Sequence, residues 1–369
     1  MVLCRTHSAV LDETGKVFVF GRTHDVEQGI RVGRRNNPIL KKFFELIGTM
    51  KSIDYPIPQQ VIFNSDAPVI QKVVASAGLT AMLSKDRKLY LIGGNAYGQC
   101  AVSKRDSYVW SPIAASLPDN DIEDVDLGFR HGVALTSKGS VYTWGKGGRG
   151  QLGLGSGQIE DVLEMTHVEN LPGCAISVAA GFTHTSALLD TGEIFVWGKL
   201  QGTKVNRRNG NYEDSSLPRK VVFNSDVKIL KMWSGQHHSV ALDSNGHFWQ
   251  YGMLPDTILE SSLLPPVVLE QLSNTLDSVA RRSSSRMIST PVKVKGLSVD
   301  PSKPVDVSVG FHHAFLCGAS LKEPLRWDWT LAAVPLSVSN PELADFVQKN
   351  TILNISDGWQ HTLFQVETR

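Results

Sequence analysis

The chain has 369 residues, of which 41% are hydrophobic and 20% charged, and its net charge is +1. This length exceeds that of a typical single core and predicts either several domains or one repeat architecture. The balanced charge excludes a strong overall field toward nucleic acid or acidic membranes. No run of about 18 uninterrupted apolar residues occurs, so we expect no membrane span.

The N-terminal residues and the cysteines favour an intracellular protein. Residues 1–9 lack the long apolar segment of a signal peptide. The four cysteines show neither zinc nor redox spacing, and each is expected to be a small buried hydrophobe; they are Cys4, Cys100, Cys174 and Cys317. This usage is typical of a reducing compartment. The sequence does not distinguish the mitochondrion from the nucleus or cytosol.

One sequence unit recurs along the chain with its landmarks at constant offsets. The clearest copy runs from Gly128 to Gly145, and the copies that begin at Gly181 and Gly235 keep the same frame. A histidine marks most copies, namely His7, His131, His184, His238, His313 and His361, and Leu79 takes this place in a weaker copy. The landmarks are 48 to 54 residues apart, except for two intervals of 72 and 75 residues that contain insertions. Such a period lies just above the range of propeller blades.

Each unit predicts four short strands. The His-x-x-Ala-Leu run is an apolar strand, and a turn that ends in glycine, such as 190–192, leads into the alternating strand at 193–197. A Pro-marked segment and a final apolar run complete the unit, as in 217–223 and 227–233. Small antiparallel sheets bury both faces when they stack around an axis, so the sequence predicts an all-β fold, a β-propeller.

These motifs resemble the repeats of the regulator of chromosome condensation family. The resemblance rests on the Gly-x-x-His-x-x-Ala-Leu, Gly-x-Val-Tyr-x-Trp-Gly and Gly-x-Gly-Gln-Leu-Gly elements, which are clearest at 128–155 and recur over nearly the whole chain. It implies one propeller domain over residues 1–369, with seven blades. Six blades are the alternative, because the copy after His313 lacks the turn glycine and the Trp-Gly pair and has 325–330 in their place.

The first long interval contains a basic insert at residues 22–55. Six cationic and three anionic side chains at positions 22–50 give a local charge of +3. Asn37 and Pro38 suit the start of a short amphipathic helix, and Gly48 suits its end. Three interpretations stay open: the helix packs on the propeller, it binds RNA, a ribosome or a partner protein, or it lies on a membrane surface. The candidate partner-binding side chains are Arg31, Arg34, Arg35, Lys41 and Lys42.

A second insert, at residues 253–291, is predicted to be partly helical and partly flexible. Its apolar side chains have helical spacing between positions 268 and 279. The polar stretch 281–286 follows, where a plain flexible loop and a phosphorylation site at Ser283 or Ser284 are the alternatives. A further short helix is expected at 340–349, capped by Asn340.

We find no constellation of residues for catalysis, cofactor binding or metal binding. Residues 145–150 match Gly-x-Gly-x-x-Gly, but the segment after them cannot form the helix that a dinucleotide site needs. The repeated histidines occupy equivalent positions in different blades, which keeps them apart, so we expect structural imidazoles with backbone partners. The protein is therefore expected not to be an enzyme and to need no cofactor.

Two hypotheses for the function stay open. The first is a non-catalytic scaffold that binds a protein or ribonucleoprotein complex, as the resemblance to mitochondrial, ribosome-associated members implies. In that case the basic cluster of the first insert would contact phosphate oxygens of RNA. The alternative is a guanine-nucleotide exchange factor for a small GTPase, as the founding nuclear member of the family is. Exchange requires tighter binding of the nucleotide-free state and no acid–base residues.

Overall fold

The computed structural model describes residues 2–3, 7–22, 54–64, 66–103, 106–117, 121–155, 160–198, 216–254, 286–310, 313–318, 321–328, 330–357 and 362–368. These residues form seven sheets of antiparallel strands, six with four strands and one with two. The sheets belong to two compact units. The first unit comprises Met1–Gly148 and Gly157–Glu169, and the second comprises Arg149–Ser156 and Asn170–Arg369.

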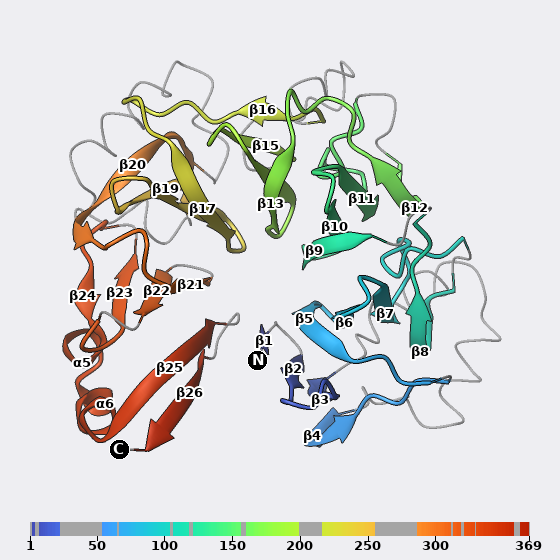
Figure 1. The fold of residues 1–369 in the computed structure, drawn as a ribbon, viewed down its shortest axis with the longest axis horizontal. Coiled ribbons are helices and arrows are strands. Elements are labelled where there is room, and N and C mark those ends of the chain that lie inside the picture. Colours follow the sequence, from blue (N-terminus) through green and yellow to red (C-terminus); the bar gives the residue numbers. More distant parts are fainter. Residues whose placement is uncertain are drawn as a thin grey trace, which may run out of the picture. The chain divides into compact units, whose positions relative to one another are not determined.

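The first unit contains three four-stranded sheets whose strands follow one another in chain order (Figure 1). The first sheet has β1 (Val2–Leu3), β2 (His7–Leu11), β3 (Val17–Arg22) and β4 (Asp54–Gln60). The second has β5 (Ile70–Ser76), β6 (Leu79–Ser84), β7 (Leu89–Gly94) and β8 (Tyr108–Ala114). The third has β9 (Ile122–Leu127), β10 (His131–Thr136), β11 (Val141–Gly145) and β12 (Val162–His167).

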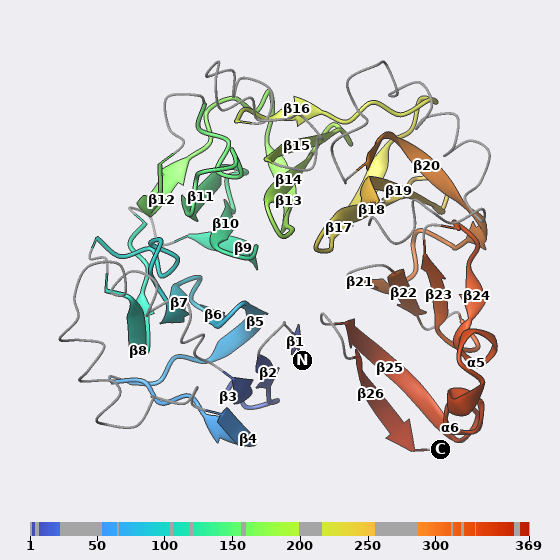
Figure 2. The ribbon, with the colours of Figure 1, turned by 180° about the vertical axis from the view of Figure 1, so that it is seen from behind.

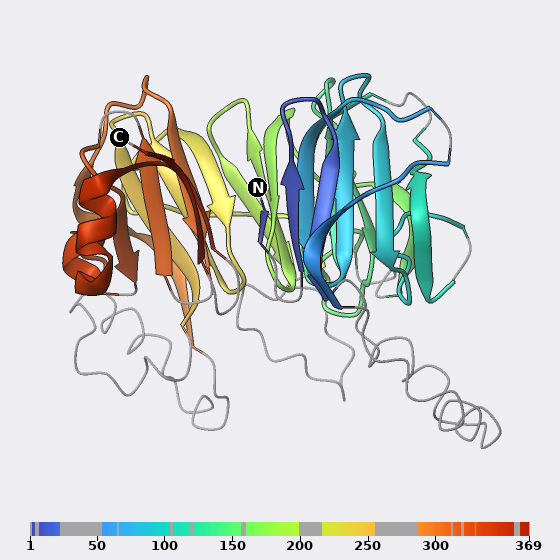
Figure 3. The ribbon, with the colours of Figure 1, turned by 90° about the horizontal axis from the view of Figure 1, so that it is seen from below.

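The second unit contains the other four sheets (Figure 2). They are β13 (Ala175–Ala180), β14 (His184–Leu189), β15 (Ile194–Gly198) and β16 (Arg219–Lys220); β17 (Ile229–Ser234), β18 (His238–Asp243), β19 (His247–Leu254) and β20 (Arg286–Ser298); β21 (Val305–Val309), β22 (His313–Gly318), β23 (Leu325–Asp328) and β24 (Val334–Pro335); and β25 (Asn350–Asp357) with β26 (Thr362–Thr368). Between β24 and β25 lie the short helices α5 (Leu336–Ser339), η2 (Pro341–Leu343) and α6 (Ala344–Lys349), which stack beside the last strands in Figure 3.

The repeated landmarks give successive sheets the same register. The landmark histidine begins the second strand and pairs with the glycine that ends the third, as His131 does with Gly145 and His184 with Gly198. Leu79 pairs with Gly93 in the same way. Every residue of β6, β10, β14 and β18 is buried. The predicted apolar strand is therefore the central strand of the core in each of these sheets.

Consecutive sheets of one unit pack face to face. In the first unit, one buried cluster joins Leu83 and Leu91 of the second sheet to Val125 and Trp144 of the third. In the second unit, a similar cluster joins Phe248 to Trp327 of the following sheet, with ring centroids 5.9 Å apart. Full burial of one such side chain contributes about 1.5–3 kcal/mol, so these contacts explain why the sheets stack.

The irregular copy after His313 forms a full sheet. His313 pairs with Asp328, so Trp327 occupies the position that Trp144 and Trp197 occupy in their sheets. Trp327 is 1% exposed, and its Nε1–H donates to Gln250 Oε1 at 2.8 Å. The number of sheets therefore confirms the expectation of seven blades over six.

The ends of both predicted inserts lie in strands. β3 extends to Arg22 and β4 begins at Asp54, while β19 extends to Leu254 and β20 begins at Arg286. Residues 23–53, which include Arg31, Arg34, Arg35, Lys41 and Lys42, lie outside the described residues, as do 255–285. The helix expected at 340–349 is present as η2 and α6, and it begins with a 3₁₀ turn in which Leu343 N–H donates to the Asn340 carbonyl at 3.0 Å.

Candidate partner-binding site

The landmark histidines lie between consecutive sheets. His7, His131, His184 and His238 are at most 2% exposed. His7 Nε2 lies 2.8 Å from Thr80 Oγ1, and His184 Nε2 lies 3.3 Å from Ser239 Oγ. Thr80 directly follows Leu79, and Ser239 directly follows His238, so each hydroxyl stands one residue after the landmark of the next sheet. These two imidazoles thus contact a hydroxyl side chain of the neighbouring sheet. His313 is half-buried, and His361 lies outside the described residues.

The three sheets of the first unit share one end, where Gly21, Gly93 and Gly145 lie at or next to the last residues of β3, β7 and β11. The His7–Thr80 contact brings the first two sheets together there. Trp144 Nε1–H donates to the backbone oxygen of Gln99, just beyond β7, at 2.8 Å. This bond joins the third sheet to the second at the same end. We call this the loop end. Strand β3 leaves it at Arg22, which pairs with Asp54 of β4. The basic insert is therefore attached to the chain at the loop end.

Tyr97 is held at the loop end by the tight loop after β7. Gln99 is 3% exposed, and its Oε1 accepts the Tyr97 backbone N–H at 2.7 Å. Asn95 Oδ1 accepts the Cys100 N–H at 2.9 Å, and burial raises the pKa of the Cys100 thiol. Gly98 has a φ of +81°, and a Cβ there would lie 2.8 Å from Leu163 Cδ2. The loop therefore has little freedom, and the Tyr97 ring has a defined place.

Arg130 lies against the rings of Tyr97 and Phe129. Its Cζ is 4.8 Å from the centroid of each ring, and its Nη1–H donates to Tyr97 Oη at 3.1 Å. The side chain is half-buried, and its Nε is fully buried without a hydrogen-bond partner. Within the described part of the chain it forms no ion pair. Two aromatic contacts of about 0.5–2 kcal/mol each thus hold a cation that no described carboxylate neutralises.

Lys146 adds a second cation to the same ring. Its Nζ lies 4.3 Å from the Tyr97 centroid, and its backbone N–H donates to the Arg130 oxygen at 2.8 Å. Gly145 makes this approach possible, because it has a φ of +94° and a Cβ there would lie 2.7 Å from the Arg130 oxygen. Asp161 lies nearby and accepts the Gly147 N–H at 3.4 Å. Tyr97, Phe129, Arg130 and Lys146 form what we call the arginine cluster.

The repeat does not require the arginine cluster. The loop after β11 repeats the glutamine contact, because Gln151 Oε1 accepts the Arg149 N–H at 2.8 Å. There, however, Arg149 stands in the place of Tyr97, and Thr183 precedes His184 where Arg130 precedes His131. The structural contact recurs, while the side chains at the positions of Tyr97 and Arg130 change. This difference favours a role in binding over a role in the fold.

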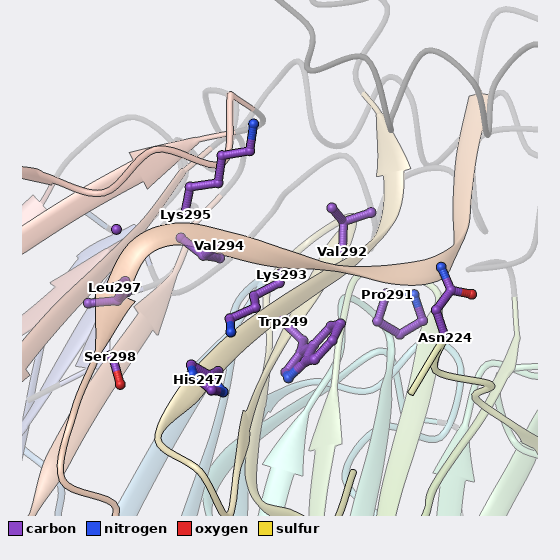
Figure 4. A pocket seen from close by; sticks show the side chains of 11 residues that line it. Asn224, His247, Trp249, Pro291, Val292, Lys293, Val294, Lys295, Leu297 and Ser298 are labelled. Atoms are coloured by element: carbon purple, nitrogen blue, oxygen red, sulfur yellow. The ribbon is translucent and has the colours of Figure 1, made fainter. Parts of the chain in front are cut away.

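A pocket of about 770 Å³ lies under strand β20 in the second unit (Figure 4). It forms because β20 bulges between Lys293, which pairs with Trp249, and Ser298, which pairs with His247. The side chains that line it include Lys293, Lys295 and His247 but no carboxylate. Lys295 N–H donates to the Leu331 oxygen at 2.6 Å and attaches the bulge to the next sheet. This packing role explains the pocket without a ligand.

Sequence reasoning missed the arginine cluster and selected the insert beside it. Tyr97 and Arg130 occupy variable positions of the repeat, so no motif marks them, whereas Phe129 has Phe182 and Phe311 as counterparts in other copies. Comparison of those positions between copies would have singled out Arg130, where the next two copies have Thr183 and His237. Among the described residues we find no group of three or more potential metal ligands. No helix in the described ranges has the length and apolar character needed to cross a membrane.

Known proteins share the repeat. Two models of the regulator of chromosome condensation (RCC1) repeat match residues 138–188 and 122–151. The chain is 30% identical over 184 residues to the ultraviolet-B receptor UVR8 of Arabidopsis thaliana, covering 50% of this chain and 41% of the receptor. It is 27% identical over 273 residues to a secretion-regulating guanine nucleotide exchange factor of Mus musculus, covering 70% and 53%. It is 30% identical over 176 residues to the mitochondrial RCC1 domain-containing protein RUG3 of Arabidopsis thaliana, covering 46% and 39%.

The chain thus spans about half the length, or less, of these curated relatives. Its fold matches a solved structure along its whole length. Prp20p of Saccharomyces cerevisiae, the yeast RCC1, superposes with a TM-score of 0.70 at 17% identity, over 100% of this chain and 82% of that one. The repeat, the seven sheets and this shared fold together show that the chain carries RCC1 repeats and has the fold of a seven-bladed β-propeller.

Proposed function

We propose that the protein is a non-catalytic scaffold that binds a macromolecular complex through the loop end of its first unit. The observation that carries this proposal is Arg130, a half-buried cation held by two rings without a described carboxylate partner. A buried charge without a counter-ion is costly in an isolated protein, and a partner that supplies the counter-ion would relieve that cost. Fold alone does not provide this inference, because propellers have many functions.

The basic insert supports the same surface. Its candidate partner-binding residues are Arg31, Arg34, Arg35, Lys41 and Lys42. The insert leaves the loop end through Arg22 and re-enters it through Asp54, and we propose that its cations bind the same partner as the arginine cluster. We propose that the complex is a ribonucleoprotein assembly of ribosomal type, with the insert beside RNA phosphates.

Affinity purification after mild lysis tests this proposal, with and without ribonuclease. We expect subunits of one large complex in the eluate, and salt-sensitive loss of them when Arg34 and Arg35 are both replaced by Glu. Loss after ribonuclease would place RNA at the contact. An eluate without any complex, at physiological salt and without ribonuclease, would contradict the scaffold function.

A second candidate function is guanine-nucleotide exchange on a small GTPase. It is supported by the similarity to the secretion-regulating exchange factor and by the shared fold with Prp20p, whose binding to Gsp1p and histones has been studied. Release of a fluorescent guanine nucleotide from a panel of small GTPases distinguishes the two functions. The scaffold function predicts no acceleration, whereas acceleration of one GTPase, together with its capture in nucleotide-free form, would establish exchange.

We also propose an intracellular, mitochondrial location, which is supported by the similarity to mitochondrial RUG3. Cell fractionation with matrix, nuclear and cytosolic markers tests it. Enrichment with the matrix marker is expected, and enrichment in the nucleus would instead favour the exchange function.

A further inference from the structure

We infer that Arg130 is the anchor for a carboxylate-rich segment of a partner protein. This inference rests on the proposed scaffold function and names the chemistry of the partner at the loop end. The arginine cluster provides the cation, its orientation and an electrostatic setting that selects an anionic peptide.

The cation is oriented before any partner binds. The guanidinium contacts the rings of Tyr97 and Phe129 and donates to Tyr97 Oη from Nη1. Tyr97 in turn is fixed by Gln99, and Lys146 by the backbone oxygen of Arg130. A planar guanidinium matches the two oxygens of a carboxylate, and a fixed side chain loses little entropy when it binds. In this inference the Nη N–H groups of Arg130 that Tyr97 does not use, and not the buried Nε, donate to the carboxylate of Asp or Glu.

Three acidic side chains of the third sheet are paired with other cations and not with Arg130. Asp121 and Glu123 bind Arg87 at 2.8 and 3.1 Å, and Asp124 binds Lys72. These residues lie at the start of β9, whose other end pairs with the start of β10 near Arg130. The negative charges are thus neutralised at one end of the sheet while Arg130 stands at the other. This distribution attracts an acidic segment to the loop end.

A protein segment fits the cluster better than RNA does. Single-stranded RNA is bound by stacking its bases on open aromatic faces along a continuous basic groove. Here Arg130 and Lys146 both lie over the Tyr97 ring, and Arg130 also lies over the Phe129 ring. The cluster contributes two cations, and the whole chain has a net charge of only +1. An acidic peptide needs only the cations and no open ring.

Fluorescence anisotropy with two labelled probes tests the inference, an oligoglutamate peptide and an oligouridylate RNA of equal charge. We expect the full chain to bind the peptide in a salt-dependent manner, and Arg130→Ala to weaken this binding at least tenfold. Arg130→Lys should recover only part of it, because it restores charge but not the planar group. Lys85→Ala is the matched control: it removes one exposed charge from the turn at the other end of the second sheet and should change nothing.

Two results would overturn the inference. Peptide binding that Arg130→Ala leaves unchanged, in a variant whose circular dichroism and melting match the wild type, would exclude Arg130 as the anchor. RNA binding that depends on Arg130 and exceeds peptide binding would replace the protein partner by RNA. In either case the scaffold function still stands if affinity purification recovers the complex, so the two failures are distinguishable.

Discussion

The indole of Trp144 donates a hydrogen bond to the backbone oxygen of Gln99 at 2.8 Å, across 45 positions of sequence and from one sheet to the next. Trp144 is 0% exposed, and the same loop positions Tyr97 through the Gln99 side chain. One residue pair thus joins two blades and fixes the loop that holds the arginine cluster. Stability and the proposed binding surface are therefore coupled at this point.

Trp144→Phe should lower the free energy of unfolding by about 2–3 kcal/mol. The substitution leaves the buried Gln99 oxygen without its donor and removes part of a packed ring. Chemical denaturation followed by circular dichroism measures the effect. Trp110→Phe is the control, because Trp110 is 58% exposed and should change stability by less than about 0.5 kcal/mol. Equal effects of the two substitutions would contradict the account.

Thr80→Val should lower the free energy of unfolding by about 1–3 kcal/mol, because valine keeps the shape of threonine but offers no partner to His7 Nε2. Thermal unfolding of wild type and variant tests this. The control is Thr191→Val, at an exposed turn position, for which we expect no measurable change. A neutral Thr80→Val would show that the hydroxyl of the neighbouring sheet is not what the landmark histidine requires.

Gly145→Ala should be more destabilising than Gly296→Ala. Both glycines have a positive φ, +94° and +69°, so both variants carry backbone strain of about 1 kcal/mol or more. At Gly145 the new Cβ would also meet the Arg130 oxygen at 2.7 Å, whereas at Gly296 nothing lies within 4 Å. Melting temperatures of the two variants give the comparison, and the reverse order would contradict the close approach of Lys146 to Arg130.

Asp243 should make stability depend on pH. Burial raises the pKa of its carboxyl, but hydrogen bonds from the Trp249 indole and the His247 and Asn245 N–H groups outweigh burial and bring it below 3.8. Because the folded pKa is the lower one, the ionised group stabilises the fold above pH 3.8, and this contribution is lost as the pH falls through the folded pKa.

Asp243→Asn removes that dependence. We expect the variant to be less stable than wild type by about 1–3 kcal/mol at neutral pH. The difference should shrink as the pH falls below 3.8 and through the lower folded pKa, where the wild-type carboxyl becomes protonated. Urea unfolding curves over this pH range measure it. A difference that stays constant into acid would show that the carboxylate charge contributes nothing.

The strands and their register follow from local sequence in most copies of the repeat. In the copy after His313, the tryptophan landmark could be assigned only from the structure. His131, the turn glycine Gly139 and the pair Trp144-Gly145 mark a strand, its turn and the next strand within 15 residues. In the copy after His313 the turn glycine is missing and the connection is longer by one residue, since His313 pairs with Asp328. The strand register identifies Trp327 as the equivalent tryptophan, and its contact with Gln250 on the neighbouring sheet agrees with this assignment.

The arginine cluster was not predictable from the repeat for a related reason. Tyr97 and Arg130 are 33 positions apart in different copies, and their contact depends on how one blade packs on the next. The frame of the repeat marks the residues that every blade needs, and the side chains that recognise a partner occupy the other positions. Charge in the insert was visible in the sequence, but its attachment at the loop end required the strand pairing of Arg22 with Asp54.

Partner binding at the loop end is tested most directly by affinity purification of wild type, Arg130→Ala and Lys85→Ala at identical salt concentration and expression level. The measured quantity is the yield of the bound complex. We predict that wild type and Lys85→Ala recover equal amounts, and that Arg130→Ala loses most of the complex while its melting temperature stays unchanged. Equal recovery by all three proteins would contradict the claim that the loop end of the first unit binds the partner.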